Sequence, residues 1–194
     1  MLEALCTGAR CLVVGSAPEM QFPKTEWDVV LAANGGVSVA RLHGVNVDVL
    51  VTTAYLCRES GHSQPEFMAL RSWRRRSFHS VWADVTEAPV TNVLSQLEKL
   101  HVGYGSICEV TKAVREDIVQ RASGLALGWS PDPSKRISTG VFAACLAVAS
   151  GAKSVDLVGI SLTSGHAIVA GGGDSPRHHI PADKLCLEKL RASA

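Results

Sequence analysis

Two short stretches of the chain place small, hydroxyl and amide residues where a ligand could reach them. Gly15 and Ser16 follow the apolar run 11–14, and a glycine there lets a ligand approach backbone amides closely. Asn34 follows the apolar run 28–33, and its amide offers a donor and an acceptor to a base edge or a sugar hydroxyl. Taken singly, an ordinary strand–helix turn explains Gly15 equally well, and a turn residue that tolerates left-handed geometry explains Asn34 better.

The segment 135–141 is the strongest candidate for an anion site. Ser138 is a good helix N-cap, and the exposed amides of a first helical turn attract anions. Arg136 adds a full charge that can bind a phosphate or a carboxylate in a bidentate manner. With the Thr139 hydroxyl and with Gly140, these features predict a phosphate or carboxylate site. The alternative is a plain helix cap beside a surface arginine.

Two adjacent histidines, His178 and His179, lie at the end of a glycine-rich stretch, 162–181, that has little apolar periodicity. A long irregular segment of this kind is often functional, and a histidine in it could act as a general base. A zinc site is disfavoured, because adjacent histidines rarely point at one metal and their spacing from His166 and Asp174 matches no standard pattern. We expect catalysis or substrate contact at this stretch, with a surface loop as the alternative.

The elements that would position these residues alternate between strand and helix. Four continuously apolar runs are typical of buried parallel strands, and a fifth run is weaker. The strands are expected at 11–14, 28–33, 47–52 and 154–158, with the weaker one at 80–83; helices are expected at 36–43, 65–76, 90–100, 109–122, 138–150 and 183–191. This alternation predicts a doubly wound, mainly parallel α/β sheet of the Rossmann-like type.

In such a sheet, ligands bind outside the carboxyl ends of the strands, at the point where the strand order reverses. We expect one ligand-binding domain over residues 1–161, a short lid over 162–181, and a closing helix of the same domain over 182–194. The GxGxxG pattern is absent after the first strand, which disfavours a conventional dinucleotide site.

Composition narrows the function classes. The chain has 194 residues, of which 46% are hydrophobic and 19% charged, so a folded core is expected. The net charge of +1 gives no global field that would favour nucleic acid or an anionic membrane. The arginine-rich run 71–76 is therefore interpreted as a solvated helix face.

The six cysteines form no CxxC pair and most lie in apolar runs, which predicts reduced, buried thiols in a cytoplasmic protein. We expect no signal peptide and no integral membrane segment, because no apolar run is long enough to span a bilayer. Peripheral association with the inner membrane and a homo-oligomeric state are left open.

The string from Arg136 to Ile160 resembles the central motif of the bacterial CMP-sialic-acid-dependent sialyltransferases, in which an Arg-Ile-Thr/Ser-Ser/Thr-Gly-Val helix start leads to a strand ending in Gly-Ile-Asp. The turn 15–18 is similar to that family's Gly-Asn-Gly-Pro turn, and Asn34 falls on its nucleotide-binding asparagine. His178 and the helix after it are similar to the lid histidine and the helix behind it. Related motility-associated glycosyltransferases share this pattern.

The resemblance implies a glycosyltransferase type A variant of the Rossmann-like fold. It also implies inverting transfer of a sugar from a CMP-activated donor to a glycan acceptor hydroxyl, with no metal and no further cofactor. His178 would be the general base. The substrate-binding residues implied are Gly15, Ser16, Asn34, Thr52, Arg136, Ser138, Thr139, Gly140, Ser161 and Thr163.

The sequence departs from the family pattern at several of these positions. Ser16 and Thr52 stand in place of asparagines, Ser161 in place of an aspartate, and Thr163 where the family has a lid tyrosine. Two other classes of function are therefore alternatives to a glycosyltransferase. One is a non-catalytic or regulatory nucleotide-binding module, and the other is a methyltransferase or pyrophosphokinase on a similar sheet.

Overall fold

The apolar runs of the sequence form the strands of one parallel sheet. The structure is a computed structural model that describes residues 2–17, 21–162 and 178–192. Within these ranges six strands pair in the order β5-β4-β3-β2-β1-β6, all parallel. The strands are β1 Arg10–Val14, β2 Val29–Ala33, β3 Val49–Thr53, β4 Ser77–Asp84, β5 Gly103–Val110 and β6 Ser154–Val158.

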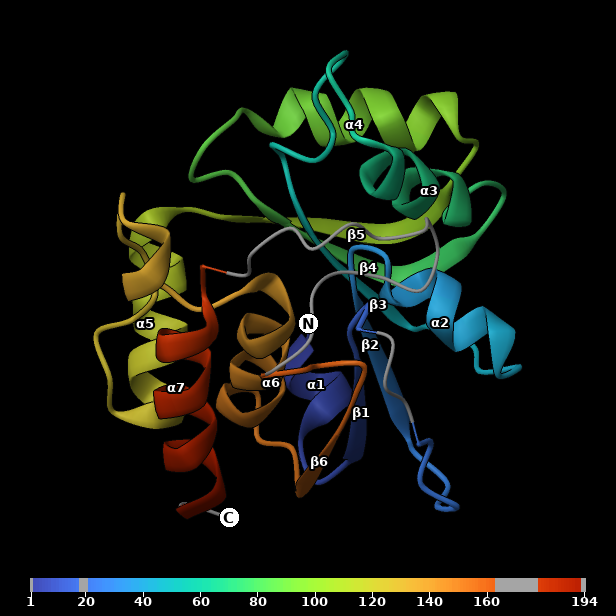
Figure 1. The fold of residues 1–194 in the computed structure, drawn as a ribbon. Helices are drawn as coiled ribbons and strands as arrows, with labels where there is room; N and C mark the ends of the chain where they lie inside the picture. The colour runs from blue at the N-terminus through green and yellow to red at the C-terminus, as the bar shows by residue number, and fades with distance from the viewer. Residues whose placement is uncertain (1, 18–20, 163–177, 193–194) are drawn as a thin grey trace.

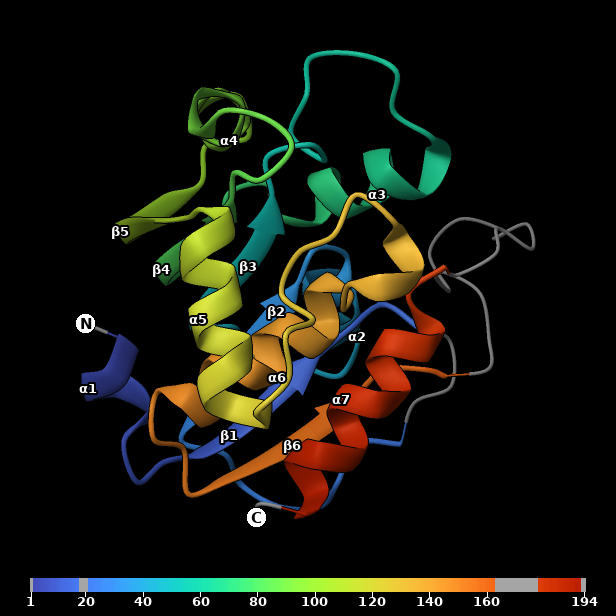
Figure 2. The same ribbon diagram turned by 90° about the vertical axis from the view of Figure 1, so that its left-hand side faces the viewer.

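Helices cover both faces of the sheet (Figures 1 and 2). The helices are α1 Leu2–Cys6, α2 Gly36–Leu42, α3 Gln64–Ser72, α4 Val90–Lys99, α5 Lys112–Ser123, η1 Pro133–Lys135, α6 Thr139–Ala149 and α7 Ile180–Ala192. One core lies between the sheet and α1, α5, α6 and α7, and a second core lies between the sheet and α2, α3 and α4. The predicted doubly wound, Rossmann-like α/β fold is thus confirmed.

Burial on both faces explains why the central strands are continuously apolar. In β1, Cys11 and Val13 belong to the first core, whereas Leu12 and Val14 belong to the second. Alternate side chains of a strand point to opposite faces, so a strand covered on both sides needs apolar residues at every position.

Most predicted elements coincide with observed ones, and the main difference is at β5. The weak fifth strand is the centre of β4, but β5 was expected to be partly loop and partly the start of a helix. β5 is an edge strand that contains Gly103 and Gly105 and is largely exposed or half-buried, so it lacks the apolar run of a central strand. Helix α5 consequently begins at Lys112 and not at Glu109.

The strand order reverses between β1 and β6, and glycines allow the backbones to pack closely at that point. The Gly15 amide donates to the Val158 carbonyl over 2.8 Å, and the Ala17 amide donates to the Gly159 carbonyl over 2.8 Å. Gly159 has φ +66°, and a methyl group added to it would lie 2.5 Å from the Gly15 carbonyl oxygen. A methyl group on Gly36 would overlap the Val14 carbonyl oxygen. The backbones therefore meet without room for side chains.

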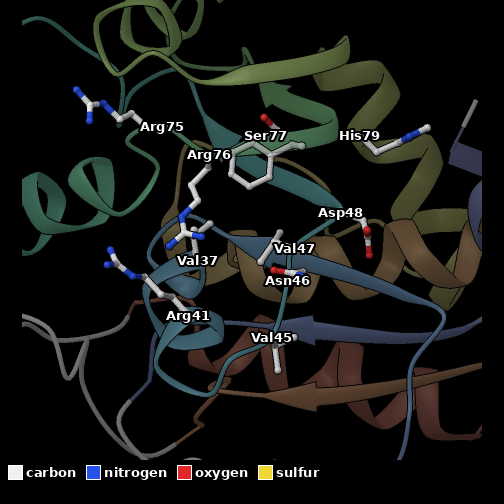
Figure 3. Close-up of a pocket in the computed structure, with 11 residues that line it drawn as sticks. Val37, Arg41, Val45, Asn46, Val47, Asp48, Arg75, Arg76, Ser77 and His79 are labelled. Carbon is white, nitrogen blue, oxygen red and sulfur yellow. The ribbon is translucent and has the colours of Figure 1, made fainter.

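The two ends of the parallel strands form two separate edges. We call the edge where the strands end the carboxyl edge, and the edge where they begin the amino edge. At the amino edge a groove of about 350 Å³ lies between the end of α2, residues 45–48 before β3, and residues 75–79 at the start of β4 (Figure 3). Across the described part of the chain, no helix is both long and apolar enough to cross a membrane.

All six cysteines fall within the described residues, where their thiols are free, and five of them are buried, as the sequence predicts. Burial raises the pKa of the Cys57 thiol to about 12, against a smaller opposing effect of a hydrogen bond with Thr52. Such a thiol stays protonated at neutral pH, which makes it a core residue rather than a nucleophile.

Gly159→Ala tests the backbone crossing at the switch point. The control is Gly44→Ala, because Gly44 has a similar φ of +70° but no atom within 4 Å of an added methyl group. We expect Gly44→Ala to cost about 1–2 kcal/mol from left-handed strain alone, and Gly159→Ala to cost about 1–3 kcal/mol more from overpacking. Urea unfolding followed by circular dichroism measures both, and equal losses would contradict the crossing.

Candidate functional site

The candidate residues within the described chain gather along the carboxyl edge, although they come from distant parts of the sequence. Gly15 and Ser16 follow β1, Asn34 follows β2, and Ser161 lies shortly after β6. Thr52 is the second-to-last residue of β3, and the segment 136–140 leads into α6. Because all the strands are parallel, their ends share one edge, which is where α/β proteins bind ligands.

Asn34 is held in an unusual conformation by its neighbours. Its φ is +47°, and its amide donates to the Val51 carbonyl over 3.0 Å. The indole of Trp73 donates to the Asn34 carbonyl over 3.1 Å, and the fully buried Thr52 hydroxyl donates to Asn34 Oδ1 over 3.0 Å. Thr52 therefore orients the half-buried amide of Asn34, whose Nδ2 group is left for a further acceptor.

The β1 turn and the start of α6 meet through Ile160. Ile160 Cγ1 lies 3.0 Å from the position of a methyl group on Gly15 and 3.4 Å from that of a methyl group on Gly140. On the other side of the turn, Ser16 Cβ lies 3.3 Å from a methyl group on Gly35. The half-buried Ser16 is thus next to the residue that follows Asn34, and the glycines allow this close approach.

The start of α6 already has a carboxylate partner from α7. Ser138 caps the helix, with its hydroxyl accepting from the Val141 amide over 3.4 Å. The Ser138 amide donates to Asp183 Oδ1 over 2.7 Å, and Asp183 is completely buried. The predicted cap is therefore present, and a carboxylate of the chain lies where the electrostatics of a helix start favour an anion.

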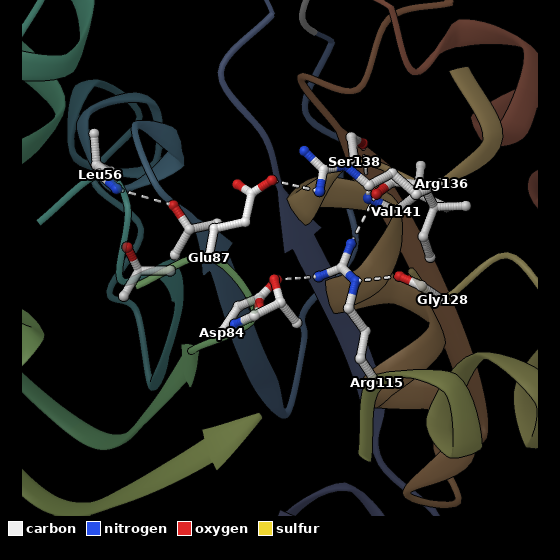
Figure 4. Close-up of polar contacts among 12 residues, drawn as sticks. Leu56, Asp84, Glu87, Arg115, Gly128, Arg136, Ser138 and Val141 are labelled. Atoms are coloured by element: carbon white, nitrogen blue, oxygen red, sulfur yellow. Dashed lines mark hydrogen bonds and ion pairs between the residues drawn. The ribbon is translucent and has the colours of Figure 1, made fainter. Parts of the chain in front are cut away.

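Arg136 also has a carboxylate partner. Its guanidinium donates to Glu87 Oε1 over 2.6 Å, which joins the segment before α6 to the loop after β4 (Figure 4). The Arg136 side chain is 16% exposed, compared with 41% for Glu87, so the pair borders solvent. The Arg136 carbonyl accepts from His179 Nδ1 over 3.0 Å. The arginine is thus charge-paired, but at a surface where a ligand anion could compete for it.

His178 lies on the surface directly before His179, whose hydrogen bond to Arg136 holds this segment beside the start of α6. The general base implied by the resemblance is therefore at the same edge as the predicted substrate residues. Thr163 and most of the predicted lid lie outside the described residues. Among residues 2–17, 21–162 and 178–192, no three His, Cys, Asp or Glu side chains form a group that could hold a metal ion.

A buried ion pair that the sequence analysis missed organises this edge. Arg115 on α5 is 3% exposed, and it donates to Asp84 Oδ2 over 2.6 Å and to the Ile137 carbonyl over 2.7 Å, with a third bond to the Gly128 carbonyl (Figure 4). Burial lowers the pKa of the Arg115 guanidinium, and the charge of Asp84 opposes that shift. The sequence does contain a sign that Arg115 is buried, because it lies three residues before Ile118 and so on the same, buried face of the helix.

The loop after β3 is fixed by a second ion pair that the sequence analysis did not single out. Arg58 binds both carboxylate oxygens of Glu66 over 2.9 Å each. The amide and the hydroxyl of Ser63 also donate to Glu66, over 2.7 Å and 2.9 Å. Led by the Arg58 contact, these donors hold the pKa of Glu66 at about 2. The start of α3 is therefore anchored to the loop that borders the carboxyl edge.

The fold and the gathered edge define a doubly wound, Rossmann-like α/β protein with a candidate ligand site at its carboxyl edge. Comparison of the chain with protein-family models, with curated proteins and with solved structures finds no match. The geometry of the carboxyl edge is therefore the main basis for a function, and the sialyltransferase resemblance stays a prediction based on the motif residues.

Arg115→Met tests the buried ion pair. Removing the guanidinium leaves the Asp84 carboxylate buried without its partner, and we expect a loss of about 3–5 kcal/mol in the free energy of unfolding. The control is Arg121→Met on the same helix, whose exposed pair with Asp117 should contribute about 0.5 kcal/mol or less. Denaturant unfolding measures both, and similar small losses would show that the pair does not organise the edge.

Glu66→Gln tests the loop anchor through pH. The folded pKa of about 2 lies below the unfolded value of about 4.3. The stabilisation is therefore present above the unfolded pKa and is lost as pH falls toward the folded pKa. Wild type should exceed Glu66→Gln in melting temperature at neutral pH, and the gap should shrink between about pH 5 and pH 2. A gap that does not change with pH, or an equal pH effect in the exposed-pair control Asp117→Asn, would contradict this assignment.

Proposed function

We propose that the chain is a sialyltransferase-like glycosyltransferase that takes a sugar from a CMP-activated donor. One observation carries this proposal: Ser16, Asn34 and the start of α6 lie together at the carboxyl edge of a parallel sheet, beside the point where the strand order reverses. Doubly wound sheets bind nucleotides at this point. The missing GxGxxG pattern favours a mononucleotide over a dinucleotide.

Within the proposal, each residue has a distinct task. The Nδ2 amide of Asn34, oriented by Thr52, donates to the base or the ribose. The amides of Thr139 and Gly140, in the first turn of α6, face the phosphate. Arg136 exchanges its contact with Glu87 for the charged groups of the donor.

His178 is the proposed general base. It takes the proton of the acceptor hydroxyl while the acceptor oxygen forms a bond to the anomeric carbon of the donor sugar. The bond from that carbon to the phosphate oxygen breaks on the opposite face, so the configuration inverts and CMP leaves with the electron pair. The exposed position of His178 beside the start of α6 suits a base that must meet an incoming acceptor.

A second candidate is a nucleotide-binding module without catalysis. A departure in the sequence favours it, because Thr163 stands where the resembled family has a lid tyrosine. In both candidates an anionic ligand must displace Glu87 from Arg136 and tolerate the buried Asp183, which bonds to the Ser138 amide. The two candidates share the nucleotide site and differ in turnover.

Ligand-dependent thermal unfolding with CMP, CDP, UDP, S-adenosylmethionine and NAD tests the nucleotide site. A ligand at about 100 times its dissociation constant adds about 2.7 kcal/mol of stability. We expect CMP and CDP to raise the melting temperature, and Asn34→Ala to reduce that rise. A rise with S-adenosylmethionine or NAD but not with CMP would overturn the proposal.

Transfer from CMP-sialic acid then separates the two candidates. His178→Ala should abolish transfer and leave the CMP-induced stabilisation unchanged, because the base does not hold the nucleotide. The control is His101→Asn, since His101 is exposed at the amino edge and asparagine tolerates its φ of +53°. CMP binding without transfer in wild type would favour the binding module. Equal turnover in wild type and His178→Ala would remove His178 as the base.

A further inference from the structure

The groove at the amino edge gathers arginines from two segments. It is lined by Arg41 at the end of α2 and by Arg75 and Arg76 in the turn between α3 and β4. Arg41 and Arg76 project into the same region of the groove beside Val37, whereas Arg75 points outward from its rim (Figure 3). Two guanidinium groups therefore share a groove of about 350 Å³, with a third at its border.

These arginines are not neutralised within the described chain. None of the three guanidinium groups has an ion pair or a side-chain hydrogen bond there, whereas Arg58 and Arg115 each bind a carboxylate. Asp48 also lines the groove, where its Oδ2 accepts from the Val30 amide over 2.8 Å and it forms no ion pair with the arginines. Three guanidinium groups against one carboxylate leave the groove with an excess of positive charge, which attracts an anion.

Backbone hydrogen bonds fix the position of the turn that carries Arg75 and Arg76. The Arg75 amide donates to the Leu100 carbonyl over 2.9 Å, and the Gly103 amide donates to the Arg76 carbonyl over 2.8 Å. Arg75 has a φ of +55°, a left-handed conformation that costs a residue other than glycine about 1–2 kcal/mol. The end of α4 and the start of β5 thus hold a strained turn, so a ligand would meet an already ordered site.

Helix ends account for some basic residues of this region but not for Arg76. Arg41 lies in the last turn of α2, and Arg71 lies in the last turn of α3, where positive charge stabilises the helix. Arg71 also lies over the Phe67 ring, with 5.7 Å between its guanidinium carbon and the ring centroid. Arg76 lies beyond α3 and has no such contact among the described residues, so its place in the groove needs another reason.

The walls of the groove strengthen a charged contact. Val37 and Phe78 are 3% and 5% exposed, and Val45 is half-buried, so apolar side chains form a part of the lining beside the guanidinium groups. Electrostatic attraction is stronger beside apolar walls than in open water. Guanidinium groups match the oxygen geometry of a phosphate, to which they can donate two parallel hydrogen bonds.

We propose that this groove is a second ligand site, which binds a phosphate monoester or a diphosphate through Arg76 and Arg41. The phosphate belongs either to a small soluble compound or to a phosphatidic acid headgroup, which share this chemistry. The five residues of β3 separate the groove from the carboxyl edge by about 17 Å. The groove is therefore distinct from the nucleotide site proposed above and does not depend on it.

Calorimetric titration of the full chain with pyrophosphate tests the groove. Wild type should bind pyrophosphate, and Arg76→Gln should weaken binding about tenfold or more, because it removes charge-assisted hydrogen bonds to the phosphate. Arg41→Gln should weaken it similarly. The matched control is Arg74→Gln, because Arg74 is exposed, lies two residues away and does not line the groove. Circular dichroism and melting temperature establish that each variant is folded.

Binding to lipid vesicles distinguishes the two sources of the phosphate, and three results would overturn the proposal. If vesicles of phosphatidylcholine with phosphatidic acid bind in an Arg76-dependent way, and pyrophosphate competes, the lipid source is supported. If pyrophosphate binds in the same way but vesicles do not, the soluble source is supported. The proposal is overturned if pyrophosphate does not bind, if Arg74→Gln weakens binding as much as Arg76→Gln, or if an oligonucleotide binds where pyrophosphate does not.

Discussion

The guanidinium of Arg115 is charged, almost fully buried, and bonded to three separate segments: the end of β4, the loop before η1, and the residue before Ser138. Moving any of these segments away would leave the buried guanidinium without a partner or expose it to water. Because either change costs free energy, the charge keeps the three segments in place. Because Ile137 lies between Arg136 and Ser138, the bond from Arg115 to the Ile137 carbonyl helps to position the start of α6, together with the bond from the Ser138 amide to Asp183. The geometry of the carboxyl edge therefore depends in part on a residue that is buried beneath it.

The two edges of the sheet treat their arginines in opposite ways. At the carboxyl edge, Arg115 and Arg136 each bond to a carboxylate of the chain, so an incoming anion must compete for charge that is already used. At the amino edge, Arg41 and Arg76 carry no such partner among the described residues and are open to an anion. An anion that binds Arg136 must therefore displace Glu87, whereas no carboxylate of the described residues has to be displaced from Arg41 or Arg76.

Local pattern predicted the parts of the fold that burial controls. The central strands are covered on both faces and were found from their apolar runs, whereas edge strand β5 has no such run and was missed. The cap at Ser138 was predicted because a cap is a local feature. Its partner Asp183 and the Glu87 partner of Arg136 lie more than forty residues away, and no local pattern specifies such pairs. Arg115 was missed because a charged residue on an amphipathic helix is usually assigned to solvent.

The strand order has a consequence for how the protein is made. Strand β1 lies between β2 and β6, yet β6 is not synthesised until residues 154–158, about 140 residues after its partner. Until then one side of β1 is an unpaired edge, and because four of its five residues are of buried apolar types, it is a template for association with other chains. Pairing over so long a separation is slow. A nascent or truncated chain that ends before β6 would therefore depend on chaperones to stay monomeric, although its other strands have all left the ribosome.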